Sequence, residues 1–152
     1  LKAFPSNTNE EAAKSQKDMV RDQIFAWQNY TWAKMQTVSG KQKAWLYMFS
    51  QKPAGQPDNG AFHSAEIAYA LHTLDLWNRP WTASDRKVED QMSSYWANFA
   101  ANGNPNGTGL PEWPAVDVKK IKAMEFKANS KLVNDPLKKE MEVLDKYQAS
   151  LR

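Results

Sequence analysis

The sequence predicts an α/β protein that forms one end of a larger α/β domain. A short, continuous apolar run over 44–49 has the length and aromatic content of a strand buried on both faces, as in parallel sheets. A weaker strand pattern covers 124–128, and helical patterns dominate the rest. A doubly buried strand needs neighbouring strands to pair with, and these 152 residues supply almost none. The apolar helices likewise need something large to pack on.

The first helix is expected to begin within 5–11, where a Pro and several capping residues precede two acids. Nothing breaks a helix from there to Val38, and Ser39-Gly40 ends it. Its second half carries too many large apolar side chains for one narrow stripe. We therefore expect that half to be buried on more than one side, through Ile24, Phe25, Trp27, Tyr30, Trp32 and Met35.

Later elements follow from turn and capping signals. Residues 50–62 are rich in Pro, Gly, Asp and Asn and form a loop, which a short helix over 64–71 follows. Thr82 and Asp85 form a capping box that opens a longer helix, which Gly103 ends. Asp135-Pro136 is expected to cap a terminal helix.

Composition excludes several classes of function. The 20 Lys and Arg are interspersed among 17 Asp and Glu, for a net charge of +3, which argues against a nucleic-acid partner. The absence of Cys excludes disulfides, thiol nucleophiles and Cys-ligated zinc. Because there are two His, a metal site would need several unpaired carboxylates, so we expect no metal or other cofactor. The longest apolar run is far too short to cross a membrane.

Seven Trp residues leave two interpretations open. Exposed aromatic side chains can stack on sugars or bases, which would make the chain a stand-alone, helical binding or interaction module without catalysis. Core packing and interface burial are the favoured explanation, because most of these Trp fall within helix or strand patterns.

His63 is the first candidate for catalysis. It follows a Gly-containing loop that leaves the predicted strand, and α/β enzymes place catalytic groups in such loops. A histidine there suits a general base, although an ordinary surface histidine fits the same pattern. His72 lies among apolar residues and is expected to be structural. The serine-hydrolase motif Gly-x-Ser-x-Gly does not occur in the sequence.

Two runs of sequence carry a family resemblance. The first is Gly60-Ala61-Phe62-His63-Ser64-Ala65-Glu66 and the apolar stretch to Leu71, and the second is Tyr95-Trp96-Ala97-Asn98-Phe99 through Gly103-Asn104-Pro105-Asn106-Gly107, with Trp113-Pro114 after it. Together with 22–25 and 45–49, they resemble the C-terminal part of the type B carboxylesterases, the cholinesterase-like α/β-hydrolases. The likeness covers about residues 1–130.

The resemblance implies a serine hydrolase that cleaves small carboxylic esters through an acyl-enzyme. It makes His63 the general base and Glu66 a supporting acid, and it places the nucleophile, the triad acid and the oxyanion hole before residue 1. Trp77 and Trp81 are expected at the edge of the substrate pocket. Ser64 departs from the family, which often has Gly directly after the histidine, and this change restricts the loop backbone.

We therefore expect residues 1–152 to form a single C-terminal carboxylesterase domain or fragment. A start at Leu1 without Met agrees with that expectation. The chain alone is expected to be inactive, and its partner to be the remainder of the esterase or a second copy bound through an exposed apolar face. Exported proteins, periplasmic or secreted, are common in the family, which favours export.

Overall fold

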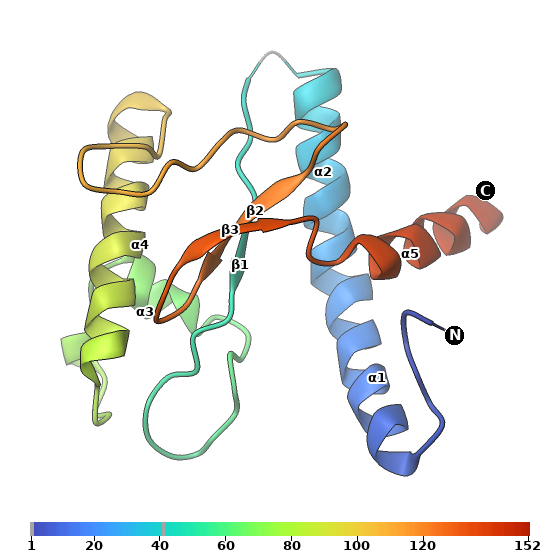
Figure 1. Ribbon diagram of the computed structural model, residues 1–152, viewed down its shortest axis with the longest axis horizontal. Helices are drawn as coiled ribbons and strands as arrows, with labels where there is room; N and C mark the ends of the chain where they lie inside the picture. The colour runs from blue at the N-terminus through green and yellow to red at the C-terminus, as the bar shows by residue number, and fades with distance from the viewer. Residues whose placement is uncertain (1, 41) are drawn as a thin grey trace. The chain divides into compact units, whose positions relative to one another are not determined.

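The computed structural model describes residues 2–40 and 42–152 (Figure 1). The chain divides into two compact units. Unit 1 comprises Leu1–Leu46, Ala115–Lys122 and Asn134–Arg152. Unit 2 comprises Tyr47–Pro114 and Ala123–Val133. Each unit is assembled from segments that lie far apart in the sequence, so neither unit is one half of the chain.

The N-terminal helices of unit 1 run on without a break. Helix α1 (Asn9–Arg21) continues through a π-helical turn (Asp22–Ala26) into α2 (Trp27–Val38). Thr8 caps the start, where its Oγ1 accepts a hydrogen bond of 3.1 Å from the Glu11 N–H. The predicted helix is confirmed in its start and end, whereas the π-helical turn was not predicted.

The core of unit 1 lies where α5 (Lys138–Ser150) packs against α2. Its buried residues are Tyr30, Ile121, Met141 and Leu144. Trp27 Nε1 donates a 2.7 Å hydrogen bond to Asp145, which ties the two helices across the chain. Met141 and Leu144 are the buried residues of α5.

Two predictions for unit 1 are wrong. The large side chains of the second half of the long helix are mostly exposed, with Trp32 at 73% and Met35 at 60%, so that half is not buried on more than one side. Asp135 does not cap α5, because its carboxylate accepts the hydroxyl hydrogen of Tyr30 instead, and Leu137 occupies the cap position.

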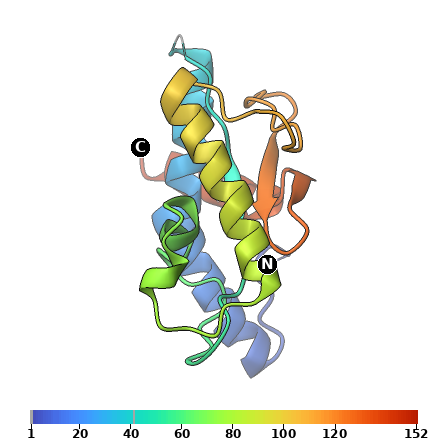
Figure 2. The same ribbon diagram turned by 90° about the vertical axis from the view of Figure 1, so that its left-hand side faces the viewer.

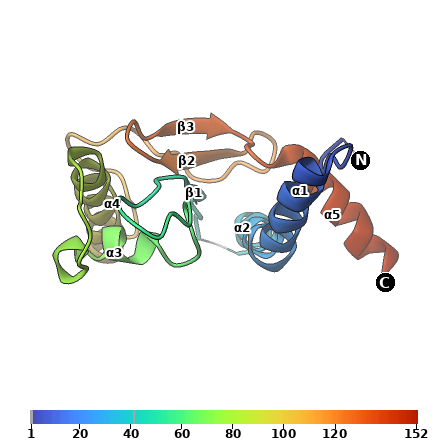
Figure 3. The same cartoon turned by 90° about the horizontal axis from the view of Figure 1, so that it is seen from below.

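Unit 2 contains a small sheet with the strand order β1-β2-β3 (Figure 3). Strand β1 (Tyr47–Phe49) runs parallel to β2 (Lys122–Phe126), with Met48 opposite Glu125, and β3 (Lys131–Asn134) adjoins β2. Both predicted strands exist, but β1 is shorter than 44–49, β2 begins earlier than 124, and β3 was not predicted. Strand β1 is also not buried on both faces, since Tyr47 is 39% exposed.

Helix α4 (Ala83–Asn102) is the longest element of unit 2 and runs beside the short helix α3 (Glu66–Ala70) (Figure 2). A 3₁₀ turn (Leu74–Leu76) follows α3. The Thr82–Asp85 capping box is present, and Gly103 ends the helix in the left-handed conformation with φ at 73°. Both signals were read correctly from the sequence.

Trp113 lies at the centre of the aromatic core of unit 2. It is 3% exposed, and its ring contacts those of Tyr47, Tyr95, Trp96 and Phe126. Packing therefore accounts for this loop tryptophan. Across residues 2–40 and 42–152, no helix combines the length and apolar character needed to span a membrane.

Candidate active site

His63 lies in a tight turn between the 50–62 loop and α3. The Ala65 N–H donates to the Phe62 carbonyl at 3.1 Å, and the Ile67 N–H donates to the Ser64 carbonyl at 3.3 Å, so hydrogen bonds enclose the turn. His63 itself is exposed. The turn follows the carboxyl end of β1, which is the position predicted for a catalytic loop.

The residue after His63 adopts a backbone conformation that favours glycine. Ser64 has φ at 68°, in the left-handed region. A residue with a Cβ atom costs about 1–2 kcal/mol in that region, whereas glycine enters it freely. Ser64 therefore leaves the turn formed but strained.

The loop before His63 is braced at several points. Lys52 forms an ion pair of 2.5 Å with Asp58, which also accepts a 3.2 Å hydrogen bond from the Gly60 N–H. Arg79 donates to the Ala54 carbonyl at 2.9 Å, and its guanidinium lies 5.9 Å from the centre of the Phe62 ring. These contacts restrain the segment that delivers His63.

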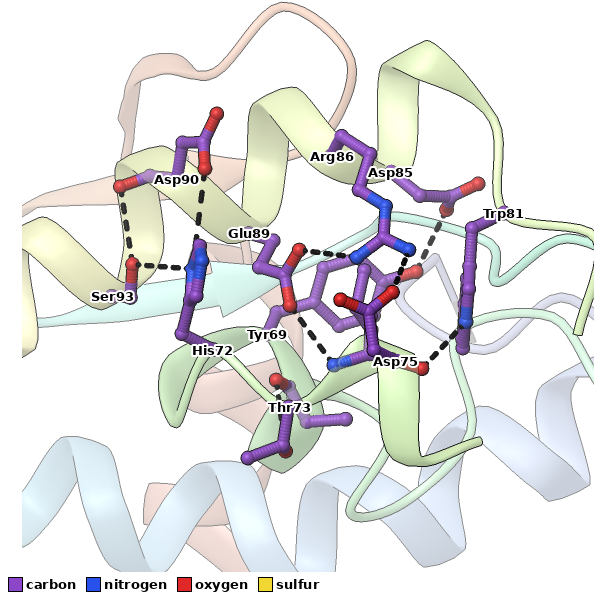
Figure 4. A network of polar contacts seen from close by, with 12 residues as sticks. Tyr69, His72, Thr73, Asp75, Trp81, Asp85, Arg86, Glu89, Asp90 and Ser93 are labelled. Atoms are coloured by element: carbon purple, nitrogen blue, oxygen red, sulfur yellow. Dashed lines mark hydrogen bonds and ion pairs between the residues drawn. The ribbon is translucent and has the colours of Figure 1, made fainter. Parts of the chain in front are cut away.

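Asp85 is the buried centre of a polar network at the base of this loop (Figure 4). Its Oδ1 accepts from the Tyr69 hydroxyl at 2.7 Å and from Gln51 Nε2 at 2.9 Å. Its Oδ2 accepts from the Thr82 N–H at 2.9 Å and the Thr82 hydroxyl at 2.6 Å. Burial opposes ionisation, but hydrogen bonds from Thr82, Gln51 and Tyr69 outweigh it and lower the pKa of Asp85.

The hydroxyl of Tyr69 titrates far from its usual range. Burial is the largest cause, and the hydrogen bond to the Asp85 carboxylate adds to it, so that both raise the pKa of Tyr69. The phenol therefore stays protonated and remains a hydrogen-bond donor at neutral pH.

A second buried carboxylate of α4 anchors the segment beyond α3. Glu89 is 2% exposed, and its Oε1 accepts a 2.9 Å hydrogen bond from the Leu74 N–H. Arg86 donates to the other oxygen at 2.9 Å and also pairs with Asp75 (Figure 4). Asp85 and Glu89 lie one helical turn apart, so α4 holds both the helix after His63 and the turn that follows it.

Glu66 begins α3, three residues after His63, and is half-buried. Burial is the main reason that the pKa of Tyr47 is raised to about 12, and the negative charge of Glu66 contributes to the shift. Glu66 thus acts electrostatically on Tyr47, the first residue of β1.

The indole N–H of Trp81 hydrogen-bonds the backbone of Trp77. Trp81 Nε1 donates to the Leu74 carbonyl at 2.7 Å and to the Trp77 carbonyl at 3.2 Å. Trp81 also packs edge-on against Tyr69, with ring centres 5.9 Å apart, whereas Trp77 is 40% exposed. Trp81 therefore supports α3, and Trp77 offers a free surface.

His72, Ser93 and Asp90 have the residue types of a catalytic triad but not its geometry (Figure 4). Ser93 Oγ lies 3.4 Å and Asp90 Oδ1 lies 3.9 Å from the same atom, His72 Nδ1. A triad needs the serine and the acid on opposite ring nitrogens. His72 instead follows the end of α3 with φ at 56°, in the left-handed conformation.

A cavity of about 350 Å³ opens beside the base of the loop. It is lined by Lys52, Pro53, Ala54, Gly55, Gln56, Asp58, Thr82 and Asp85, so neither Trp77 nor Trp81 borders it. Within the part of the chain that the structure describes, no group of three His, Asp or Glu side chains is arranged to hold a metal ion.

A profile of the carboxylesterase family matches residues 2–144, a span that includes the His63 turn and α4. The chain belongs to the carboxylesterase family. It is 34% identical over 107 residues to liver carboxylesterase 1 of Oryctolagus cuniculus, a stretch that covers 67% of this chain and 19% of that protein. It is also 35% identical over 79 residues to cocaine esterase of Homo sapiens, which covers 48% of this chain and 14% of that protein.

Solved structures agree with this carboxylesterase assignment. A PNB esterase matches with a TM-score of 0.75 and 25% identity, over 93% of this chain and 28% of that chain. The predicted fold class, a helix-rich portion of an α/β-hydrolase, is thereby confirmed. The matched part of the chain spans 14% of the length of cocaine esterase and 28% of that of the PNB esterase.

Sequence reasoning missed most of the buried polar network around α4. Asp85 was identified only as a helix cap, and Gln51, Tyr69 and Glu89 were not singled out. The available signal was a second acid, Glu89, one helical turn after the capping acid Asp85. A carboxylate on the inner face of a helix needs hydrogen-bond donors from elsewhere in the fold.

Proposed function

We propose that this chain is the base-bearing, C-terminal part of a serine carboxylesterase. The observation that carries the proposal is the position of His63: an exposed imidazole on a hydrogen-bonded turn after the carboxyl end of β1, inside the segment that the carboxylesterase family matches. Loops at that edge of an α/β sheet carry catalytic groups.

In the proposed reaction, a serine outside residues 1–152 attacks the ester carbonyl while His63 accepts the serine proton. His63 then donates this proton to the leaving oxygen of the ester. The alcohol departs, and the acyl group stays bound to the serine. Water hydrolyses the acyl-serine in the same two proton transfers. Glu66 supports the start of α3, and Trp77 borders the site that receives the ester.

The proposed partner is the remainder of the esterase. The matched segment covers 28% of the PNB esterase chain and 14% of cocaine esterase, and α2 carries an apolar surface of the kind that such a remainder would cover. On it, Trp32 and Val38 are each 73% exposed and Met35 is 60% exposed. Self-association through the same surface is the alternative for the isolated chain.

The test is the ester hydrolase activity of the longer protein, expressed with the residues that its gene encodes before Leu1. His63→Gln should lower kcat on p-nitrophenyl acetate by about 10⁴-fold or more, with little change in KM, because the base acts only in the chemical steps. The matched control is His72→Gln, which should retain activity. Activity that survives His63→Gln overturns the proposal.

The isolated chain should be inactive, since a base without a nucleophile and oxyanion donors forms no acyl-enzyme. The measurement is p-nitrophenol release by the purified chain compared with buffer. Turnover that disappears in His63→Ala would mean that a nucleophile lies within residues 1–152.

A further inference from the structure

The segment that carries His63 is tied at both of its ends to one atom. Gln51 lies at the start of the 50–62 loop and Tyr69 lies within α3, and both donate to Asp85 Oδ1, at 2.9 Å and 2.7 Å. The span of seventeen residues between them, 52–68, is therefore closed through a single carboxylate oxygen on α4. All the groups that form this closure lie within unit 2.

We propose that Asp85 is a positioning residue for His63, which it holds by clamping the two ends of the 51–69 segment. The inference rests on the proposed role of His63 as general base, but the clamp itself is a property of the fold. Asp85 does not touch the reacting atoms; it acts through Gln51 and Tyr69.

The Asp85 carboxylate is well suited to this task because it is itself immobilised. It is 1% exposed, and its second oxygen accepts both the backbone and side-chain hydrogens of Thr82. Its position in the first turn of α4 also places its charge near the positive end of the helix dipole. The clamp is thus one immobilised acceptor to which two buried donors from different segments bind.

The α3 end of the clamp is close to the histidine. Tyr69 is fully buried and lies on a helix of five residues, which is too short to hold its own orientation. Between His63 and Tyr69 lie only the strained Ser64, Ala65 and the first three residues of α3. Loss of the Tyr69–Asp85 bond should therefore let α3 and the His63 turn move together.

The experiment uses the 152-residue chain and two variants that remove one donor each while preserving side-chain volume. Tyr69→Phe removes the hydroxyl, and Gln51→Met removes the amide. Each should raise hydrogen-exchange rates of the amides in 52–65 by about 5- to 10-fold, the effect of losing one hydrogen bond. Each should also shift the His63 Hε1 resonance in proton NMR, which His63→Gln assigns among the two histidines.

Glu89→Gln is the matched control. It removes the charge of a second buried carboxylate on α4, which binds the Leu74 N–H and not the 51–69 segment. It should speed exchange only around 72–77 and leave the His63 resonance in place. The clamp is refuted if neither donor variant changes exchange in 52–65 or the His63 resonance, or if Glu89→Gln changes both equally. Two variants at opposite ends keep the test decisive should either one fold poorly.

A second measurement separates the clamp from the catalytic proposal. In the longer esterase, Tyr69→Phe should lower kcat by about 10- to 100-fold with KM nearly unchanged, because a displaced base affects the chemical step. If His63→Gln leaves activity intact, the proposed function fails while the NMR result still decides the clamp. If His63→Gln abolishes activity but Tyr69→Phe leaves kcat unchanged, the positioning role fails alone.

Discussion

Asn106 holds Trp113 in the aromatic core by both atoms of its amide group. Its Nδ2 donates to the Trp113 carbonyl at 2.8 Å, and its Oδ1 accepts from the Trp113 N–H at 2.6 Å. The amide side chain thus hydrogen-bonds the N–H and C=O of Trp113 as a neighbouring strand would. Asn106→Ala removes both bonds and leaves the backbone of a residue that is 3% exposed without those partners.

The expected loss follows from these contacts. Each neutral hydrogen bond contributes about 1 kcal/mol, and a buried donor left unpaired costs about 1–3 kcal/mol. Because the two bonds share one side chain, their effects overlap. Asn106→Ala should therefore lower the free energy of unfolding by about 2–3 kcal/mol, which is a large share of the stability of a domain of this size.

Urea unfolding, followed by far-ultraviolet circular dichroism, measures this change. Asn106→Asp is the control: it keeps an acceptor for the Trp113 N–H but replaces the donor with an oxygen that faces the Trp113 carbonyl. It should fall between the wild type and Asn106→Ala at pH 4 and below, where the carboxyl can be protonated and donate, and approach Asn106→Ala at neutral pH. A loss of unfolding free energy below about 0.5 kcal/mol in Asn106→Ala would refute a stabilising role for the two Asn106–Trp113 hydrogen bonds.

Three further outcomes are expected. Ser64→Gly should be more stable than Ser64→Ala by about 1 kcal/mol in urea unfolding, because only glycine enters the left-handed region without cost; equal stabilities would contradict the strain. The lowered pKa of Asp85 stabilises the fold above the unfolded-state value near 4, so that stability should fall as pH drops through the lower folded-state value, and Asp85→Asn should flatten this acid dependence of the unfolding midpoint. An isolated chain with its apolar α2 surface exposed should elute as a dimer in size-exclusion chromatography, and Trp32→Glu should return it to a monomer; a wild-type monomer at high concentration would contradict self-association.

Local signals in the sequence predicted the helices because each signal is satisfied within a few residues. Thr82 with Asp85, Gly103, and the Ser39-Gly40 stop all act on the helix that they flank. The terminal helix was misplaced because Asp135, a good local cap, binds Tyr30 instead, which is 105 residues away. Long-range competition of this kind leaves no trace in a local pattern.

The site was only partly accessible from the sequence. His63 and Glu66 stand in a recognisable run, so their neighbourhood could be predicted from residue order alone. The clamp joins Gln51, Tyr69 and Asp85, whose spacing follows no motif, and it becomes visible only when α3 lies against α4. The exposed face of α2 was misjudged because an apolar pattern indicates what a helix can bury, not whether its partner belongs to the same chain.

Fragment complementation tests the central claim most directly. The 152-residue chain and the polypeptide encoded before Leu1 would be produced from separate genes in one cell, and p-nitrophenyl acetate hydrolysis measured for each alone and for the pair. We predict hydrolysis only by the pair, abolished by His63→Gln and retained in His72→Gln. An active pair that carries His63→Gln, or a chain that hydrolyses the ester alone through His63, would contradict the account.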